Sequence, residues 1–484
     1  MVLVLTITLP LLGGGVVAGW RHPLAPWAAV ATNGAALALG IWIAVHVVES
    51  GPLNGAAGVL RADALSAFMV IVIGAIALLA SWLGIRTISI ELAEGRCTPR
   101  RATTYGVLVQ AFVAAMLLAV LAANVGVLWL AVEATTVVTT FLVGHRRTKG
   151  ALEASWKYIV ICSVGIALAF LGTVLVYLCA MHAGGHSAGA LDWTSLMANA
   201  RHLDPSVLRL GFALVVLGYG TKVGLAPMHS WLPDAHSQAP APISALMSGV
   251  LLTVAFYAIL RFKAVTDLAL GPGFSRTLLV IVALLSLAVA ASLLLTQRDY
   301  KRMLAYSSLE HMGLIALGAA AGIPLAIAAV LLHILGHGLA KSVLFLTSGE
   351  IMVAEDTSQI EGVSSLLARR PALGGVFGVG LVALLGLPPF SLFSSELLMA
   401  RAEFEVGLGW AAVAAVVAML VIFVAVVGHA RHMLLGPADK EALVTPPNWV
   451  AAPLVGGLVV CGLIGVFAWP LSGLLEAAAH VVAP

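Results

Sequence analysis

The chain of 484 residues is 61% hydrophobic and only 10% charged, with a mean hydropathy of +1.06, whereas an average soluble domain has about 25% charged residues. The apolar residues run continuously along the whole chain, which excludes a water-soluble fold, a globular domain on one anchor and a β-barrel with its alternating pattern. A net charge of +3, with basic residues in short loops and not in a stripe with aromatics, argues against a nucleic-acid partner.

Fourteen stretches of about 20 apolar residues, each long enough for one helix across a bilayer, follow one another along the chain. We therefore predict an all-α, polytopic membrane protein that forms a single membrane domain over 1–484. The first 20 residues contain no Lys or Arg, so they lack the basic start of a cleavable signal and are predicted to be the first membrane helix. The predicted helices, one to fourteen, are 1–20, 27–48, 64–85, 104–122, 125–144, 157–180, 206–232, 241–262, 276–296, 302–322, 325–350, 373–400, 408–430 and 449–473.

The loop charges predict the orientation of the chain. With the N-terminus outside, 15 of the 25 Lys and Arg residues fall in inner loops and 7 in outer loops or helix ends, while Lys157, Lys222 and Lys341 lie inside predicted helices. Inner loops of membrane proteins carry an excess of Lys and Arg. Both termini are therefore predicted to lie outside the cell (cytoplasmic) membrane.

Two predicted helices are interrupted in a similar way. Helix seven contains GLAP at 224–227, and helix twelve contains GLPPF at 386–390. Proline removes a helix hydrogen bond, and a broken helix is tolerated in a membrane only where its freed carbonyls face protein or water. Five-helix units at 104–262 and 276–430 would start on opposite sides of the membrane. This is the expected form of an inverted repeat, in which broken helices mark a transport site.

Ionisable residues inside the predicted helices mark the candidate site, because each costs about 2.5 to 3.5 kcal/mol at a bilayer centre and usually faces a cavity. Glu133 lies in the middle of helix five and Lys157 near the start of helix six. Lys222 lies at the break of helix seven, and Glu396 follows the break of helix twelve. A Glu133–Lys222 pair would titrate as a coupled unit, so a change that separates the partners would change the protonation of both. This behaviour is what a proton-translocating element requires.

Helix eleven adds His333, His337 and Lys341, whose spacing of four residues places them on one slowly drifting face. The two histidines also match an HxxxH pattern for a metal or haem, but no Glu adjoins the first His as it does in zinc proteases. In helix ten, Glu310 and His311 are adjacent and cannot share a face, so at least one of them is expected to be structural.

Other interpretations of the charged residues are structural. The Glu133–Lys222 pair could serve only to fix helix packing, and Lys157 could extend its ammonium group to the inner surface. The cysteines, Cys97, Cys162, Cys179 and Cys461, show no CxxC or closely spaced cluster of the kind that iron–sulfur and zinc sites need. We therefore expect no redox centre, metal site, cofactor-binding residue or catalytic residue in this chain.

Several stretches resemble the antiporter-like proton-channel subunits of respiratory complex I, Mrp-type cation/proton antiporters and membrane-bound hydrogenases. The signature stretches are GYGTKVGLAPMHSWLPDAH at 218–236 and APAPISAL at 239–246. Within that group, ALEASWKY at 151–158, AYSSLEHMG at 305–313 and SGVLL at 248–252 are most similar to hydrogenase-4 component F. The resemblance spans about 104–430 of the printed sequence and thus most of the chain.

The resemblance implies fourteen helices with two inverted five-helix repeats. It also implies a hydrated central axis along which protons move, with the family's charged positions in helices five, seven and twelve at Glu133, Lys222 and Glu396. The family's His-x-x-x-Lys motif matches His337 and Lys341, with His333 one turn earlier. Lys157 matches a family lysine in helix six.

The sequence departs from the family in helix eight, where several members have a titratable Lys or His that links the two half-channels. Here the region offers only Ser248 and Thr253, so protons would cross by hydroxyls and water. The chain ends at Pro484 and lacks the long lateral helix of the largest complex I antiporter subunit, which argues against that identity.

We therefore expect a proton-translocating membrane subunit of a multi-subunit redox complex of the hydrogenase-4/formate hydrogenlyase or NADH:quinone oxidoreductase type. Iron–sulfur centres, and a NiFe centre if the complex is a hydrogenase, would lie in partner subunits, both membrane and peripheral. One alternative is a subunit of an Mrp-type antiporter that exchanges Na⁺ or K⁺ for protons without redox partners. Another is a membrane scaffold that kept the fold without conducting.

Overall fold

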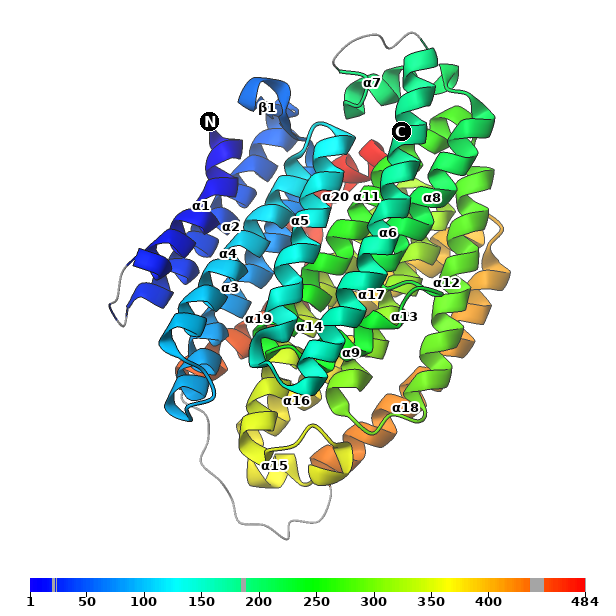
Figure 1. The fold of residues 1–484 in the computed structure, drawn as a ribbon. Coiled ribbons are helices and arrows are strands. Elements are labelled where there is room, and N and C mark those ends of the chain that lie inside the picture. Colours follow the sequence, from blue (N-terminus) through cyan, green and yellow to red (C-terminus); the bar gives the residue numbers. More distant parts are fainter. Residues whose placement is uncertain (20–21, 23, 184–188, 436–447, 484) are drawn as a thin grey trace.

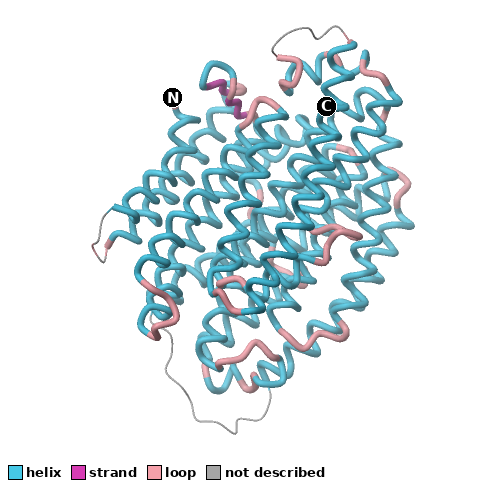
Figure 2. The backbone as a smooth tube through the Cα atoms, viewed as in Figure 1, coloured by secondary structure: helices cyan, strands magenta, loops and turns pink. Residues whose placement is uncertain are grey.

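The computed structural model describes residues 1–19, 22, 24–183, 189–435 and 448–483, and most of them lie in one bundle of long helices (Figure 1). The strands within these ranges, β1 (Leu53–Gly55) and β2 (Leu60–Ala62), form a short antiparallel hairpin between α2 and α3 (Figure 2). The helices are α1 (Val2–Gly19), α2 (Ala25–Ser50), η1 (Ala56–Gly58), α3 (Ala64–Ala93), α4 (Pro99–Leu121), α5 (Val125–Val143), η2 (Gly144–Arg146), α6 (Lys149–His182), α7 (Trp193–Ala198), η3 (Ala200–His202), α8 (Pro205–Val223), α9 (Trp231–Gln238), α10 (Ala241–Leu246), η4 (Met247–Leu251), α11 (Leu252–Leu270), α12 (Pro272–Leu294), α13 (Tyr300–Ala321), α14 (Pro324–Glu355), η5 (Ile360–Gly362), α15 (Leu366–Arg369), α16 (Pro371–Leu384), α17 (Ser391–Glu405), α18 (Gly409–Leu435), α19 (Asn448–Val466) and α20 (Trp469–Val482).

The predicted all-α, polytopic membrane fold is confirmed. Among the described residues, 12 helices are long and apolar enough to cross a membrane. The two predicted helices outside this set, 302–322 and 373–400, are helical too, as α13 and as the pair α16 and α17. Figure 1 marks both chain ends on the side of the bundle that carries β1 and α7, as an even number of crossings requires. The total of fourteen crossings and the inverted repeat stay predictions.

Capping residues explain where several helices begin. The short polar break at Ala123-Asn124 separates α4 from α5, because the Asn124 side chain accepts the Gly126 N–H at 2.8 Å and starts a new helix. Asp63 caps α3 and Asp299 caps α13 in the same way. These helices therefore begin where a short polar side chain can accept a hydrogen bond from a free backbone N–H group.

The last predicted helix, 449–473, differs from the structure. Helix α19 ends at Val466 and a second helix, α20, begins at Trp469 and continues to Val482. Pro470 at the first turn of α20 has no N–H to donate, so it can begin a helix but not continue one. The predicted fourteenth helix is thus two helices that reach nine residues further than expected.

Both predicted breaks are present, and in each one the backbone leaves the helix at a glycine. Helix α8 ends at Gly224, whose φ of 82° favours glycine, and α9 begins at Trp231. The freed Thr221 carbonyl accepts a hydrogen bond from the Trp231 indole at 2.8 Å. Helix α16 ends before Gly386, with φ of 62°, and α17 begins at Ser391. Each break contains one cis X-Pro bond.

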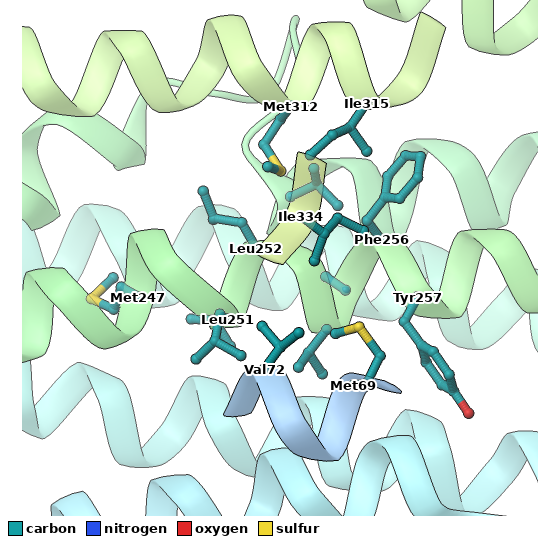
Figure 3. Packing of buried hydrophobic residues seen from close by; sticks show 14 of the residues in the cluster. Met69, Val72, Met247, Leu251, Leu252, Phe256, Tyr257, Met312, Ile315 and Ile334 are labelled. Atoms are coloured by element: carbon teal, nitrogen blue, oxygen red, sulfur yellow. The ribbon is translucent and has the colours of Figure 1, made fainter. Parts of the chain in front are cut away.

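The centre of the bundle is formed by α10, η4 and α11, which together form predicted helix eight, and by α14. The most apolar 18 residues of each of these two helices are completely buried in the protein, so neither is a lipid-facing helix. Figure 3 shows Leu251, Leu252 and Phe256 of this central helix packed among side chains of α3, α13 and α14. The polar residues on these helices therefore lie in a protein interior, which is where the candidate site is found.

Candidate functional site

A first cluster surrounds Lys222 at the end of α8. Its side chain is fully buried, and its Nζ donates to Thr136 Oγ1 at 2.9 Å and to Tyr158 Oη at 2.6 Å. The break after Val223 ends the helix directly beyond this lysine. Hydroxyl groups carry no charge, so they do not neutralise the ammonium group. Its electrostatic energy therefore changes whenever a nearby charge changes.

Glu133 belongs to the same cluster but does not contact Lys222. The two groups interact electrostatically, yet no ion pair joins them among the described residues. Glu133 Oε2 is buried and lacks a hydrogen-bond partner within that part of the chain. The expected Glu133–Lys222 pair is therefore a separated pair, with Thr136 one turn of α5 from the carboxylate. A separated pair can exchange a proton through an intervening hydroxyl or water, which a tight ion pair cannot do without first opening.

Lys157 is placed away from this cluster. Its side chain is 47% exposed, and its Nζ contacts Glu153 at 2.7 Å and Asp234 at 3.0 Å. Asp234 also accepts from Arg302 at 2.6 Å, so these charges form a network at one end of the bundle. Lys157 therefore extends its ammonium group to the surface, as its structural interpretation expected. The residue of α6 that contacts Lys222 in the interior is the next one, Tyr158.

A second cluster surrounds Lys341 on α14. Its buried Nζ donates to the Leu304 carbonyl at 2.6 Å and to Ser307 Oγ at 2.5 Å, both on α13. Glu310, one turn further along α13, interacts with this ammonium group electrostatically. Lys341 thus repeats the arrangement at Lys222, with an ammonium group held by uncharged oxygen atoms and a carboxylate nearby.

Three buried histidines follow on the same helices. His311 Nδ1 lies 3.0 Å from His333 Nε2, and His333 Nδ1 lies 2.9 Å from Ser395 Oγ of α17. Because Ser395 donates its own hydrogen to the Leu392 carbonyl, its oxygen accepts from His333 Nδ1. His333 Nε2 is then the acceptor and His311 Nδ1 the donor. Glu310 lines the cavity described below and His311 contacts His333, so the two adjacent side chains have different neighbours. A structural role for one of them stays a prediction.

His337 lies beside this chain of hydrogen bonds. Its ring centre is 4.9 Å from that of His311, and neither of its ring nitrogens has a hydrogen-bond partner among the described residues. A free imidazole next to a hydrogen-bonded pair can turn toward either side, which suits a group that passes protons on.

Glu396 lies directly against the second break. A Cβ at Gly386 would meet its carboxylate and force the Glu396 side chain to shift, and the φ of 62° also favours glycine here. Glu396 also lines a cavity of about 490 Å³, together with Glu310 and Glu403, and none of the described residues that line the cavity is basic. The cavity thus offers three carboxylates from two helices to a cation or a proton.

Of the two hydroxyl residues predicted to replace a Lys or His in the central helix, Ser248 reaches the second cluster, whereas Thr253 donates to the Val250 carbonyl of its own helix. Ser248 Oγ lies 2.7 Å from Ser308 Oγ, and Ser308 donates to the Leu304 carbonyl that Lys341 also contacts. Ser248 belongs to η4, a π-helical turn, and such turns are frequent at functional sites.

Sequence reasoning did not identify several polar groups of the interior. Tyr158, Ser395, His236 and Glu403 are buried, and His236 stacks on Phe345 with both ring nitrogens unpaired within the described ranges. Lys301, counted as an inner-loop residue, is buried and caps the end of α9 by donating to the carbonyl of Ser237 and to that of Ala239, the residue after the helix. Glu403 could have been found from its spacing of seven residues from Glu396, which places both on one helix face.

The chain is similar in sequence to several known proteins. The family model described as "NADH:quinone oxidoreductase/Mrp antiporter, TM" matches residues 122–422, which include both clusters. A hydrogenase-4 component F homolog of Methylacidiphilum infernorum is 43% identical over 324 residues, which are 66% of this chain and 67% of that protein. Hydrogenase-4 component B of Escherichia coli is 30% identical over 352 residues, which are 70% of this chain but only half of that protein.

Solved structures share the fold. A chain of the archaeal membrane-bound sulfane sulfur reductase superposes with a TM-score of 0.89 at 24% identity, covering 100% of this chain and 98% of that one. A chain of the Mrp complex from Dietzia gives a TM-score of 0.85 at 21% identity, covering 99% and 97%. The family match covers more than half of the sequence, and the chain belongs to the NADH:quinone oxidoreductase/Mrp antiporter transmembrane family.

Proposed function

We propose that this chain carries protons across the cell membrane as a subunit of a multi-subunit redox complex of the hydrogenase-4 or NADH:quinone oxidoreductase class. The observation that carries the proposal is that two buried lysines, Lys222 and Lys341, are held by hydroxyls and carbonyls and have a carboxylate nearby but not in contact. A buried charge costs several kcal/mol unless it is paired, so an unpaired one implies a function. The relatives named as hydrogenase-4 components support the choice of complex.

The proton path in this proposal has three parts. A change of charge in a neighbouring subunit alters the interaction of Glu133 with Lys222, and Lys222 passes its proton toward the central helix. Ser248, Ser308 and water carry it to Lys341. From there the histidines at 311, 333 and 337 pass it to Glu396 and the carboxylate-lined cavity.

The orientation and organisation of the chain belong to the same proposal. Both termini lie outside the cell, and the five-helix units 104–262 and 276–430 form an inverted repeat with one lysine cluster in each half. The electron-transfer centres, iron–sulfur clusters and a NiFe centre in a hydrogenase, lie in partner subunits. The chain itself supplies proton carriers only.

The first test is the composition of the native complex. The tagged chain, extracted from its own membrane in mild detergent, should co-purify with iron–sulfur subunits and with iron, and with nickel if the complex is a hydrogenase. Recovery with small membrane subunits and no metal-containing partner would contradict the redox assignment. It would instead favour the exchange of Na⁺ or K⁺ for protons, to which the three carboxylates of the cavity are also suited.

The second test is Lys222→Ala in the assembled complex. Vesicle acidification driven by the electron donor of the complex should be lost, while assembly and electron transfer by the isolated redox subunits persist. Lys263→Ala is the matched control, because Lys263 is equally buried but is paired with Asp267 at 2.5 Å. It should lower the yield of assembled complex and leave acidification per assembled complex unchanged. Acidification that survives in Lys222→Ala would contradict the proposed path.

A further inference from the structure

Three side chains that are distant from the proton path meet at the end of the bundle opposite to β1. Glu91 lies in the last turn of α3, Cys97 in the loop before α4, and His145 in η2 after α5. His145 Nε2 is 3.3 Å from Glu91 Oε2 and 3.9 Å from Cys97 Sγ. One ligand atom from each residue lies within 4.8 Å of the other two.

The two distances from His145 are close to the edges of a tetrahedral zinc site. Zinc bonds are about 2.0 to 2.2 Å to nitrogen and oxygen and about 2.3 Å to sulfur, so neighbouring ligand atoms stand roughly 3.3 to 3.6 Å apart. Thiolate, imidazole and carboxylate are also the three ligand types that Zn²⁺ prefers. The His145–Cys97 distance is thus a few tenths of an ångström too long, and the Cys97–Glu91 distance, which is at most 4.8 Å, closes with a shift of up to about 1 Å in the Cys97 side chain.

The three ligands are held in place by their surroundings. The Cys97 backbone N–H donates to the Glu91 carbonyl at 3.0 Å, which folds the loop back over the end of α3. Arg146 Nε donates to Glu91 Oε1 at 2.9 Å and leaves Oε2 facing His145. The Tyr105 ring packs against the His145 ring with centres 5.0 Å apart. Hydrogen bonds of this kind orient metal ligands in proteins.

We propose that Glu91, Cys97 and His145 bind one Zn²⁺ ion, with water in the fourth position. The ion joins the end of α3 to the loop before α4 and to the end of α5. Arg146, which contacts both Glu91 and Met352 of α14, extends this link toward the central helix. The site lies outside the apolar core and keeps one open position, which water fills.

Zn²⁺ binds the thiolate form of cysteine, so binding releases the Cys97 thiol proton to solvent. Arg146 stays on Oε1 of Glu91, while Oε2 is available to the ion. Binding should accordingly weaken as the pH falls.

Co²⁺ is the probe for this site because a thiolate–Co²⁺ bond gives a charge-transfer band in the near ultraviolet that oxygen and nitrogen ligands do not. The intact complex, stripped with a chelator and kept anaerobic, should bind one Co²⁺ per chain at this site and show the band, and added Zn²⁺ should erase it. Cys97→Ser should lose the band and His145→Ala should lose saturable binding. Cys179→Ser, at the other end of the bundle, should retain both.

The inference is overturned if the unmodified complex shows no thiolate band, or if the band persists in Cys97→Ser. A measurement on the unmodified protein avoids any folding defect of the variants. Zinc X-ray absorption should show, for this site, one sulfur at about 2.3 Å and nitrogen or oxygen ligands at about 2.0 to 2.2 Å, and an all-oxygen shell would contradict it. None of these readouts depends on proton transport, so the proposed function and the zinc site can fail separately.

Discussion

Buried cations occur in two kinds of surroundings along the central helices. On α11, Arg261 forms two hydrogen bonds to the Asp63 carboxylate, at 2.5 and 2.7 Å, and Lys263 contacts Asp267 at 2.5 Å. In the middle of the bundle, Lys222 and Lys341 are equally buried but are held by hydroxyls and carbonyls. A contact ion pair fixes a charge and two helices in place. A cation without such a partner is free to lose or gain a proton, and this difference separates structural from functional charges.

The largest expected effect is on transport, from Lys341→Met. Removing this proton carrier should lower vesicle acidification roughly 100-fold, the lower end of what a positioned proton donor contributes. Complex assembly should be unchanged, since no carboxylate loses a contact partner. Lys263→Met should instead lower complex assembly and leave transport per assembled complex unchanged, because it leaves the Asp267 carboxylate without its partner. Equal loss of transport in both variants would remove the distinction between the two kinds of charge.

Asp63→Asn should affect stability and leave transport per assembled complex unchanged. Removing one partner of a buried ion pair costs about 3 to 5 kcal/mol, which thermal unfolding of the complex would register as a lower Tm. Burial alone would raise the pKa of Asp63, but the charge and hydrogen bonds of Arg261 lower it below its ordinary 3.8. The ion pair therefore contributes fully above that pH and loses its contribution as the pH falls through the lowered pKa. A normal Tm in Asp63→Asn would contradict the assignment.

The histidine chain can be tested one link at a time. His333→Ala removes the acceptor of His311 and should slow acidification about tenfold, as expected when a buried hydrogen-bond partner is lost. Ser395→Ala removes only the group that orients His333, so its effect should be smaller. A larger loss in Ser395→Ala than in His333→Ala would be inconsistent with the order of donors and acceptors.

The smallest effect is expected at the cavity. Glu403→Gln removes one of three carboxylates that attract protons or cations, and should slow acidification about threefold. Glu405→Gln is the matched control two residues away, because Glu405 is 45% exposed and paired with Arg401. If both variants behave alike, the cavity has no part in transport.

Much of the architecture could be predicted from the sequence because bilayer thickness and backbone hydrogen bonding allow few alternatives. The apolar stretches predicted the helices, and the GLAP and GLPPF segments predicted both breaks. Short polar residues such as Asn124 marked where helices start. Counting basic residues in loops predicts the orientation of the whole chain, but it does not place each residue correctly. Lys301, counted as a loop residue, is buried and caps a helix. No feature of the sequence predicted that the last helix would continue past Pro470 to Val482.

The sequence by itself identified Lys222, Lys341 and the histidines of α14 as interior residues, because an ionisable group in an apolar helix is conspicuous, but it missed Lys301 and Glu403. Only the tertiary structure decided how they are partnered. It separated Glu133 from Lys222, moved Lys157 to the surface, joined His333 to His311 and Ser395, and brought Cys97 to His145. These contacts join residues 22 to 62 positions apart in the chain. Periodicity along one helix cannot reveal them, because they depend on how separate helices pack.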